Sequence, residues 1–220
     1  GAGAVSFKPE EQSRRRYNRK EVTEIGRQAA QDSCKQLCQS NKGEPTGQEP
    51  LYYNHQNTGR PVADDNEKFA KFASNCLDVS NGPLYPFGYG LSYTYFSYSN
   101  FRLSSQEAGI SNEEATEWQD GKKITASVTV KNNGSRDADE IVQLYIRDMV
   151  ASISRPVKEL KGFQRIHLAV GESKEVSFDI TPDMLKFYNA DLKHVIEPGD
   201  FQIMIGTNSK DVKTMKLNVK

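Results

Sequence analysis

The sequence predicts an all-β protein: an antiparallel β-sandwich over residues 93–220, preceded by a long N-terminal arm that contains at most a short helix. Two observations predict this class. Apolar and polar residues alternate with period two in roughly seven short segments of that range, and turn residues separate the segments. Short alternating strands joined by turns are typical of a sandwich whose two facing sheets supply the core.

The first expected strand contains a change of phase. Phe96 and Tyr98 share one face of the alternation, whereas Phe101 and Leu103 fall on the opposite face. An extra residue in the strand would return both pairs to one side, so we expect a β-bulge near Asn100.

The next two strands differ in their patterns. Residues 124–131 alternate strictly, which indicates a half-buried strand, and Asn-Asn-Gly at 132–134 tolerates positive φ and should end it in a turn. Residues 140–148 are apolar on both faces. We therefore expect this strand to be central in its sheet or covered on each side.

Four further strands are expected at residues 161–168, 176–180, 201–205 and 215–219. A turn at Gly171 precedes the second of these, and Glu-Pro-Gly-Asp at 197–200 opens the third.

The first 92 residues lack this pattern. Residues 1–46 form an atypical segment whose apolar residues have loose helical spacing, which predicts a weak helix or irregular chain and no second core. Residues 47–92 are rich in aromatic residues, Gly and Pro but have little period. We expect an arm that packs on the sandwich.

Composition argues against several classes of protein. Lys plus Arg and Asp plus Glu both number 29 in 220 residues, so no one-sided charge favours nucleic acid or a membrane surface. The basic run at 14–20 is flanked by glutamates, which favours a solvated run over a nucleic-acid patch. The sequence contains no apolar run of about 18 residues and no signal-peptide core near its start.

Cysteine and histidine spacing predicts no metal and no cofactor. Cys34 and Cys38 would share one face of a helix, but His55, His167 and His194 are scattered and form no ligand motif with them. We interpret the thiols as incidental.

Four motifs carry a family resemblance. These are LYYNHQNTGRP (51–61), NGPLYPFGYGLSYTYFSYSNFRLS (81–104), ASISRPVKELKGFQRI (151–166) and EPGDFQIMIGTNS (197–209). In order and spacing they resemble the C-terminal part of glycoside hydrolase family 3, of the bacterial β-glucosidase and β-xylosidase type. The resemblance runs from about residue 47 to 220 and implies a fibronectin type III-like sandwich, carbohydrate metabolism and a periplasmic or secreted location. Residues 1–46 lack the apolar lead-in usual in the family.

In that family the PFGYGLSYT motif lies where the chain leaves the catalytic domains and enters the sandwich. Its residue types suit such a junction, because glycines permit a sharp bend and Pro86 pre-sets a turn. Tyrosine and phenylalanine rings offer apolar faces that water partly reaches. We expect Gly88 and Gly90 to form the bend, and Tyr85, Phe87, Tyr89 and Tyr93 to pack between domains rather than to form a sugar platform.

No catalytic residue is predicted. Retaining glycosidases need two carboxyl groups about 5–5.5 Å apart, and the barrel that carries the nucleophile of the family takes about 250 residues. Neither family residue has a counterpart in this sequence. The acidic clusters at 64–67 and 113–117 are hydrophilic, so nothing there should separate the pKa values of two acids.

Four functions are therefore weighed. The first is a non-catalytic accessory domain that docks on a catalytic glycosidase domain, or pairs with a second copy, through residues 47–95. The second is a stand-alone carbohydrate-binding module that binds an oligosaccharide through exposed aromatics such as Trp118, Tyr52, Tyr53 and Tyr95. An active β-glucosidase and an adhesion-type domain are the others. The candidate binding residues, for docking or for sugar, are Tyr53, Asn54, Asn57, Arg60, Tyr89, Tyr93 and Arg155.

Overall fold

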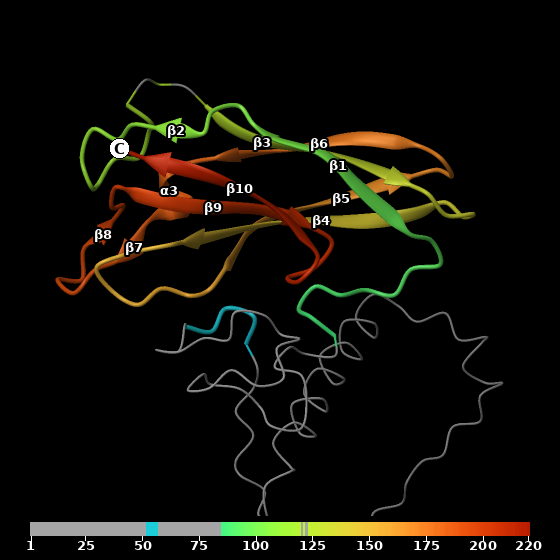
Figure 1. Ribbon diagram of the computed structural model, residues 1–220, viewed down its shortest axis with the longest axis horizontal. Coiled ribbons are helices and arrows are strands. Elements are labelled where there is room, and N and C mark those ends of the chain that lie inside the picture. Colours follow the sequence, from blue (N-terminus) through green and yellow to red (C-terminus); the bar gives the residue numbers. More distant parts are fainter. Residues whose placement is uncertain (1–51, 57–84, 120, 122) are drawn as a thin grey trace, which may run out of the picture.

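A computed structural model describes residues 52–56, 85–119, 121 and 123–220. Within these residues two β-sheets pack face to face (Figure 1), which confirms the predicted all-β sandwich. The weak helix expected in residues 1–46 and most of the arm lie outside the described residues.

The first sheet has the strand order β1-β3-β6 and is antiparallel. Its strands are β1 (Phe96–Leu103), β3 (Ile124–Asn132) and β6 (Ser173–Ile180). The pairing of β1 with β3 shifts register between Ser99 and Arg102, and Asn100 has φ 51°. This confirms the predicted bulge, which returns Phe101 and Leu103 to the core side, where both pack on the buried cluster.

The second sheet has the order β2-β10-β9-β4-β5. Its strands are β2 (Glu107–Ala108), β4 (Ala138–Asp148), β5 (Glu159–Leu168), β9 (Gly199–Gly206) and β10 (Val212–Val219). The β2–β10 pair is parallel and the other pairs are antiparallel. β4 lies between β9 and β5, as its two apolar faces predicted.

The seven long strands match the seven predicted ones. The sequence pattern missed the shorter elements: β2, the pair β7 (Phe187–Tyr188) and β8 (His194–Val195), and the helical turn α3 (Pro182–Leu185). Elements of two to four residues are too short to display a hydrophobic period.

The core lies between the sheets and is formed by the apolar residues of the predicted alternations. Val128, Leu144, Ile203 and Leu217 are fully buried within it. Trp118 also belongs to this core: it is 7% exposed and its indole N–H donates to the Ile180 carbonyl at 3.0 Å. The expectation that Trp118 is an exposed ring for sugar binding is therefore wrong.

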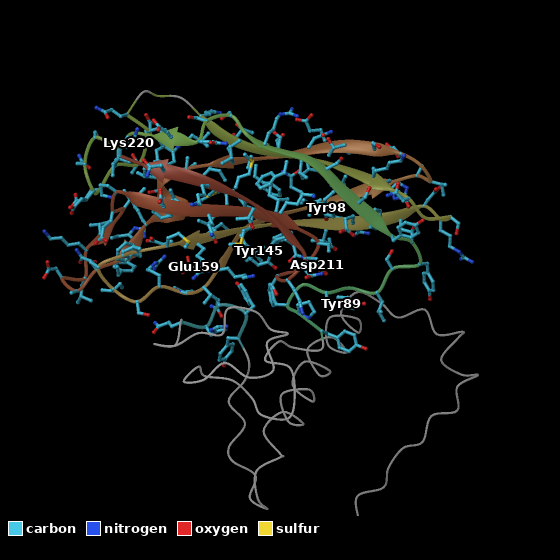
Figure 2. All side chains as sticks on the ribbon, viewed as in Figure 1. Tyr89, Tyr98, Tyr145, Glu159, Asp211 and Lys220 are labelled. Carbon is cyan, nitrogen blue, oxygen red and sulfur yellow. The ribbon has the colours of Figure 1, made fainter. Side chains whose placement is uncertain are left out.

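One polar contact joins β1 to β4 across the sandwich. The Tyr98 hydroxyl donates to a carboxylate oxygen of the buried Glu140 at 2.7 Å. Burial raises the pKa of the Glu140 carboxyl and also that of the Tyr98 hydroxyl. Figure 2 labels Tyr98 between the two layers.

The turn after β3 forms differently from the prediction. None of the residues 132–134 has positive φ. Instead, the buried Asn132 side chain accepts from the Thr94 hydroxyl (2.6 Å) and the Gly134 N–H (3.0 Å), and donates to the Leu168 carbonyl (3.1 Å). Gly134 is required for space, because a Cβ there would overlap Thr94. The predicted turn at Gly171 is confirmed, with φ 78°.

No helix among the residues that the structure describes is both long and apolar enough to cross a membrane. In the same part of the chain, no group of three or more His, Cys, Asp or Glu side chains is placed to hold a metal ion.

Candidate docking surface

The outer face of β4 is buried although it points away from the inter-sheet core. Val142, Leu144 and Ile146 belong to that core, whereas Gln143 and Tyr145 point to the other side. Tyr145 is 0% exposed and Gln143 is 4% exposed. Other segments of the chain must therefore cover this face of β4.

Both hydrogens of the Gln143 side-chain amide are donated in hydrogen bonds. Its Nε2 donates to the Gly88 carbonyl at 3.2 Å and to the Thr207 carbonyl at 2.7 Å. Its Oε1 accepts a 2.5 Å hydrogen bond from the Tyr145 hydroxyl. Burial raises the pKa of Tyr145, so that this hydroxyl stays protonated and able to donate. A fully satisfied buried network of this kind fixes one arrangement of its partners.

The first covering segment is the turn Pro86–Tyr89. The Tyr89 N–H donates to the Pro86 carbonyl at 3.0 Å, and Gly88 has φ 79°. A Cβ at Gly88 would overlap the Gln143 side chain, so glycine is needed there for both conformation and space. The Phe87 carbonyl accepts from the Ser209 N–H at 2.8 Å.

The prediction for Gly90 is wrong. Its φ is not positive, and a Cβ there would meet no atom within 4 Å. Gly88 alone makes the bend, and Pro86 is the first, buried residue of the turn.

The second covering segment is residues 52–56, which lie on the same side of the sandwich as the turn (Figure 1). The Tyr53 ring stacks on Phe87 with a centroid distance of 4.1 Å and an angle of 17°, and meets Tyr145 edge-on at 5.8 Å. The Tyr53 hydroxyl accepts from the Leu160 N–H at 3.3 Å. The Tyr53–Phe87 stack thus lies over Tyr145.

The same segment joins the loop before β5. The His55 carbonyl accepts from the Val157 N–H at 2.9 Å, and Gln56 forms an isolated antiparallel bridge with Pro156. Residues about 100 positions apart in the sequence are therefore held together beneath the sandwich.

A group of rings and one leucine extends from these anchored segments toward solvent. We name it the aromatic face; its side chains are 41% to 81% exposed, and Figure 2 shows Tyr89 extending from the sandwich. Its members are Tyr52, Phe87, Tyr89, Leu91, Tyr93 and Tyr95. These side chains come from two segments that lie on one side of the sandwich, and large exposed apolar side chains grouped on one side of a domain are typical of an interaction surface.

The structure brings together some of the predicted candidate residues. Tyr53 is half-buried in the stack, Asn54 is exposed beside it, and Tyr89 and Tyr93 belong to the aromatic face. Asn57 and Arg60 lie outside the described residues.

Arg155 has contacts within the chain. Its side chain is 15% exposed, Nη2 lies 3.4 Å from the Glu159 carboxylate, and the guanidinium lies 4.7 Å from the centroid of the Phe187 ring. Its backbone neighbour Pro156 pairs with Gln56, so Arg155 lies close to the covering segment.

Sequence reasoning missed Gln143 as a functional residue and gave Tyr145 only a place in a strand. A signal for Tyr145 exists, because the second apolar face of residues 140–148 requires a cover. No comparable signal identifies Gln143, whose partners are backbone carbonyls 55 and 64 residues away.

This surface is suited to binding another molecule. Exposed ring faces and a fixed turn suit contact with another apolar or aromatic surface. The glutamates 113, 114 and 117 are exposed, as their hydrophilic surroundings predicted, and the acidic cluster at 64–67 lies outside the described residues.

Comparisons with known proteins agree with the fold. Residues 140–209 match the family model of the fibronectin type III-like domain. A periplasmic β-glucosidase of Salmonella typhimurium is 50% identical over 167 residues, which are 76% of this chain and 20% of that protein. A β-xylosidase of Formosa agariphila is 46% identical over 140 residues, which are 63% of this chain and 18% of that protein.

A solved structure is also similar. The crystal structure of a β-glucosidase from Listeria innocua in complex with isofagomine superimposes with a TM-score of 0.67 and 40% identity. The match covers 77% of this chain and 22% of that one. The chain thus spans about a fifth of the length of the relatives that it matches.

Proposed function

We propose that this chain serves as a non-catalytic accessory domain of a β-glucosidase or β-xylosidase. The premise is that the sandwich is a fibronectin type III-like domain of the glycoside hydrolase family 3 type. In this role it docks on a catalytic domain through the aromatic face and the segment 52–56.

One observation carries the proposal: two of the exposed rings, Phe87 and Tyr89, are borne by a turn that the domain itself fixes. The turn Pro86–Tyr89 is held by Gln143 and Ser209 and stacked on Tyr53. Binding through a surface that is already ordered avoids the entropic cost of fixing a loop on association.

The composition of the surface supports the same role. Tyrosine and phenylalanine are enriched in the cores of protein–protein interfaces, where charged side chains are depleted, and tyrosine is among the residue types enriched in hot spots. All six members of the aromatic face are apolar or aromatic. The surface therefore fits a protein partner with an apolar patch.

A chimeric enzyme tests the proposal. The segment of the Listeria innocua β-glucosidase that matches this chain is replaced by residues 47–220 of this chain. We expect the chimera to hydrolyse an aryl β-glucoside and to unfold in one transition, because the domain docks as the native segment does.

Variants of the chimera then locate the contact. The double variant Phe87→Ala/Tyr89→Ala should weaken docking by about 2 kcal/mol or more, seen as a separate, earlier unfolding transition of the sandwich. The matched control is Phe163→Ala, an exposed phenylalanine of β5 outside the aromatic face. If both variants behave as the parent chimera does, the aromatic face is not the docking surface.

Sugar binding by the isolated chain is the alternative. Tyr52 and Tyr95 remain exposed, but the burial of Trp118 removes the ring best suited to stack on a sugar. Isothermal titration with cellobiose, xylan and laminarin distinguishes the two functions. Heat at millimolar sugar that is lost in Tyr52→Ala and Tyr95→Ala would favour a carbohydrate-binding module.

A further inference from the structure

A small cavity lies beneath the loop that connects β4 to β5. It has a volume of about 10 Å³ and is walled by apolar side chains, which include Ile146, Leu185 and Phe201. Four charged residues also line it: Asp148 at the end of β4, Arg155 in the loop, and Glu159 and Lys161 of β5. The cavity lies apart from the Tyr53–Phe87 stack, and none of the roles described above uses it.

Asp148 and Arg155 each bury one polar atom that has no hydrogen-bond partner within the described part of the chain, whereas Lys161 and Glu159 pair with each other. These atoms are the Asp148 Oδ2, an acceptor, and the Arg155 Nε, a donor. The remaining contacts of the Arg155 guanidinium are already fixed, since Nη2 faces Glu159 and the plane lies over the Phe187 ring. Buried polar groups in folded proteins almost always have a partner, either protein or ordered water.

Size and polarity together identify the partner. A volume of about 10 Å³ is close to the minimum that holds one water molecule, and such a water needs at least two polar neighbours. A water molecule can both accept and donate hydrogen bonds, which matches one free donor and one free acceptor. We infer that this cavity is an internal hydration site, in which one water accepts from Arg155 Nε–H and donates to Asp148 Oδ2.

Such a water connects the loop to the sheet. Asp148 belongs to β4, whereas Arg155 immediately precedes Pro156 and Val157, the two residues that contact Gln56 and His55. The water therefore fixes the loop on which segment 52–56 rests. This inference does not depend on the proposed docking function, because both its atoms and its consequence lie within this chain.

A crystal structure of the intact chain tests the site directly. We expect one ordered water about 2.7–3.2 Å from both the Asp148 Oδ2 and the Arg155 Nε. A direct contact between the two side-chain atoms, an empty cavity, or an ion in place of the water would overturn the inference.

A substitution tests the consequence in solution. Arg155→Lys replaces Nε–H by a methylene group and retains a positive charge near Glu159. Oxygen-17 magnetic relaxation dispersion should then report about one fewer long-lived internal water than in the wild type. Hydrogen exchange at the Val157 amide, which donates to His55, should become about tenfold faster.

The matched control is Arg136→Lys, the same change at an exposed position. It should alter neither the water count nor the exchange of the Val157 amide. An unchanged water count in Arg155→Lys would overturn the inference. If that variant does not fold, the wild-type crystal structure still decides.

Discussion

The two faces of β4 are buried by different means. On the inner face, Val142, Leu144 and Ile146 meet the aliphatic side chains of the opposite sheet in a core formed by strands. On the outer face, the Gln143 side chain donates to the Gly88 carbonyl of the turn Pro86–Tyr89, and Tyr145 meets the Tyr53 ring edge-on.

The inner face is fully packed against the opposite sheet, whereas the segments that cover the outer face carry rings that are still exposed. Aliphatic packing is non-directional, so the inner face needs only residues of suitable size at alternate positions. The outer face depends on individual donors and acceptors, and its cover ends in rings that are 41% to 81% exposed. We therefore expect substitutions on the inner face to affect the whole fold and those on the outer face to affect the covering segments.

The largest effect is expected on the inner face. Leu144→Ala removes a fully buried side chain and should lower the free energy of unfolding by about 3 kcal/mol, through lost burial and the cavity left behind. Urea unfolding followed by circular dichroism measures it. The control Val170→Ala, at a half-exposed position, should change the midpoint little. A loss below about 1 kcal/mol for Leu144→Ala would mean that packing on the inner face of β4 contributes little to the free energy of unfolding.

The next largest loss of stability is expected at Gly88 of the covering turn but not at Gly90, which directly follows the turn. Gly88→Ala should lower the free energy of unfolding by about 2 kcal/mol, because alanine is strained at φ 79° and its Cβ overlaps Gln143. The Ser209 amide, which donates to Phe87, should exchange faster. Gly90→Ala has open space and an ordinary φ, so it should change neither measurement. Equal effects at both positions would contradict the anchored turn.

A smaller effect is expected for one hydroxyl. Tyr145→Phe keeps the ring beneath Tyr53 but removes the donor to Gln143, which leaves a buried acceptor unsatisfied. The cost should be about 1–2 kcal/mol. Hydrogen exchange should become faster at the Tyr89 amide of the turn and at the Ser209 amide, which donates to the turn, and should stay unchanged in β3 and β6. A uniform increase across the sandwich would show that Tyr145 supports the core and not the cover.

The inner face of β4 also carries carboxyl groups, since Glu140 is buried against Tyr98 and Asp148 ends the same strand, and these groups should make stability depend on pH. Burial raises the pKa of Asp148, at the end of β4, from 3.8 to about 6; the charge of Arg155 opposes the shift, whereas Glu197 and Glu159 add to it. The folded state therefore binds this proton more readily, so its stabilising contribution is complete below pH 3.8 and is lost as the pH rises through about 6.

Replacement of Asp148 tests that sign. Asp148→Asn should raise the free energy of unfolding at pH 7.5, relative to the wild type, by at most about 1 kcal/mol, because the side chain is only partly buried and solvent screens the effect. The gain should vanish at about pH 4. Urea midpoints of both proteins at the two pH values provide the measurement. A gain that is equal at both values would assign it to packing instead of ionisation.

The same contrast explains what could be predicted from the sequence. The inner face was predicted well: all seven long strands, the bulge at Asn100 and the turn at Gly171 follow from period-two alternation and turn chemistry. These signals lie within short segments of sequence, so they can be recognised without knowing which elements pack against each other. The domain boundaries at 46/47 and 92/93 stay predictions.

The outer face was predicted only in outline, and one member of the core was missed. Trp118 was taken for an exposed ring because a loop aromatic gives no local sign of burial, and its indole partner Ile180 lies 62 residues away. Likewise the hydrogen bond from Leu160 to Tyr53 spans 107 residues. Contacts of this kind depend on the tertiary arrangement of single atoms, and no periodicity records them.

The smallest effect on stability tests the largest claim about function. Tyr93 is 81% exposed, so Tyr93→Ala should change the free energy of unfolding of the isolated chain by less than about 0.5 kcal/mol. In the chimera with the Listeria innocua catalytic domains, the same substitution should destabilise the docked sandwich, because a ring that is exposed in the isolated chain becomes buried against its partner. Differential scanning calorimetry of both proteins supplies the comparison, with Tyr188→Ala, also exposed but borne by β7, as the control. A loss that is equally small in the chimera and the isolated chain would mean that Tyr93 faces solvent in both.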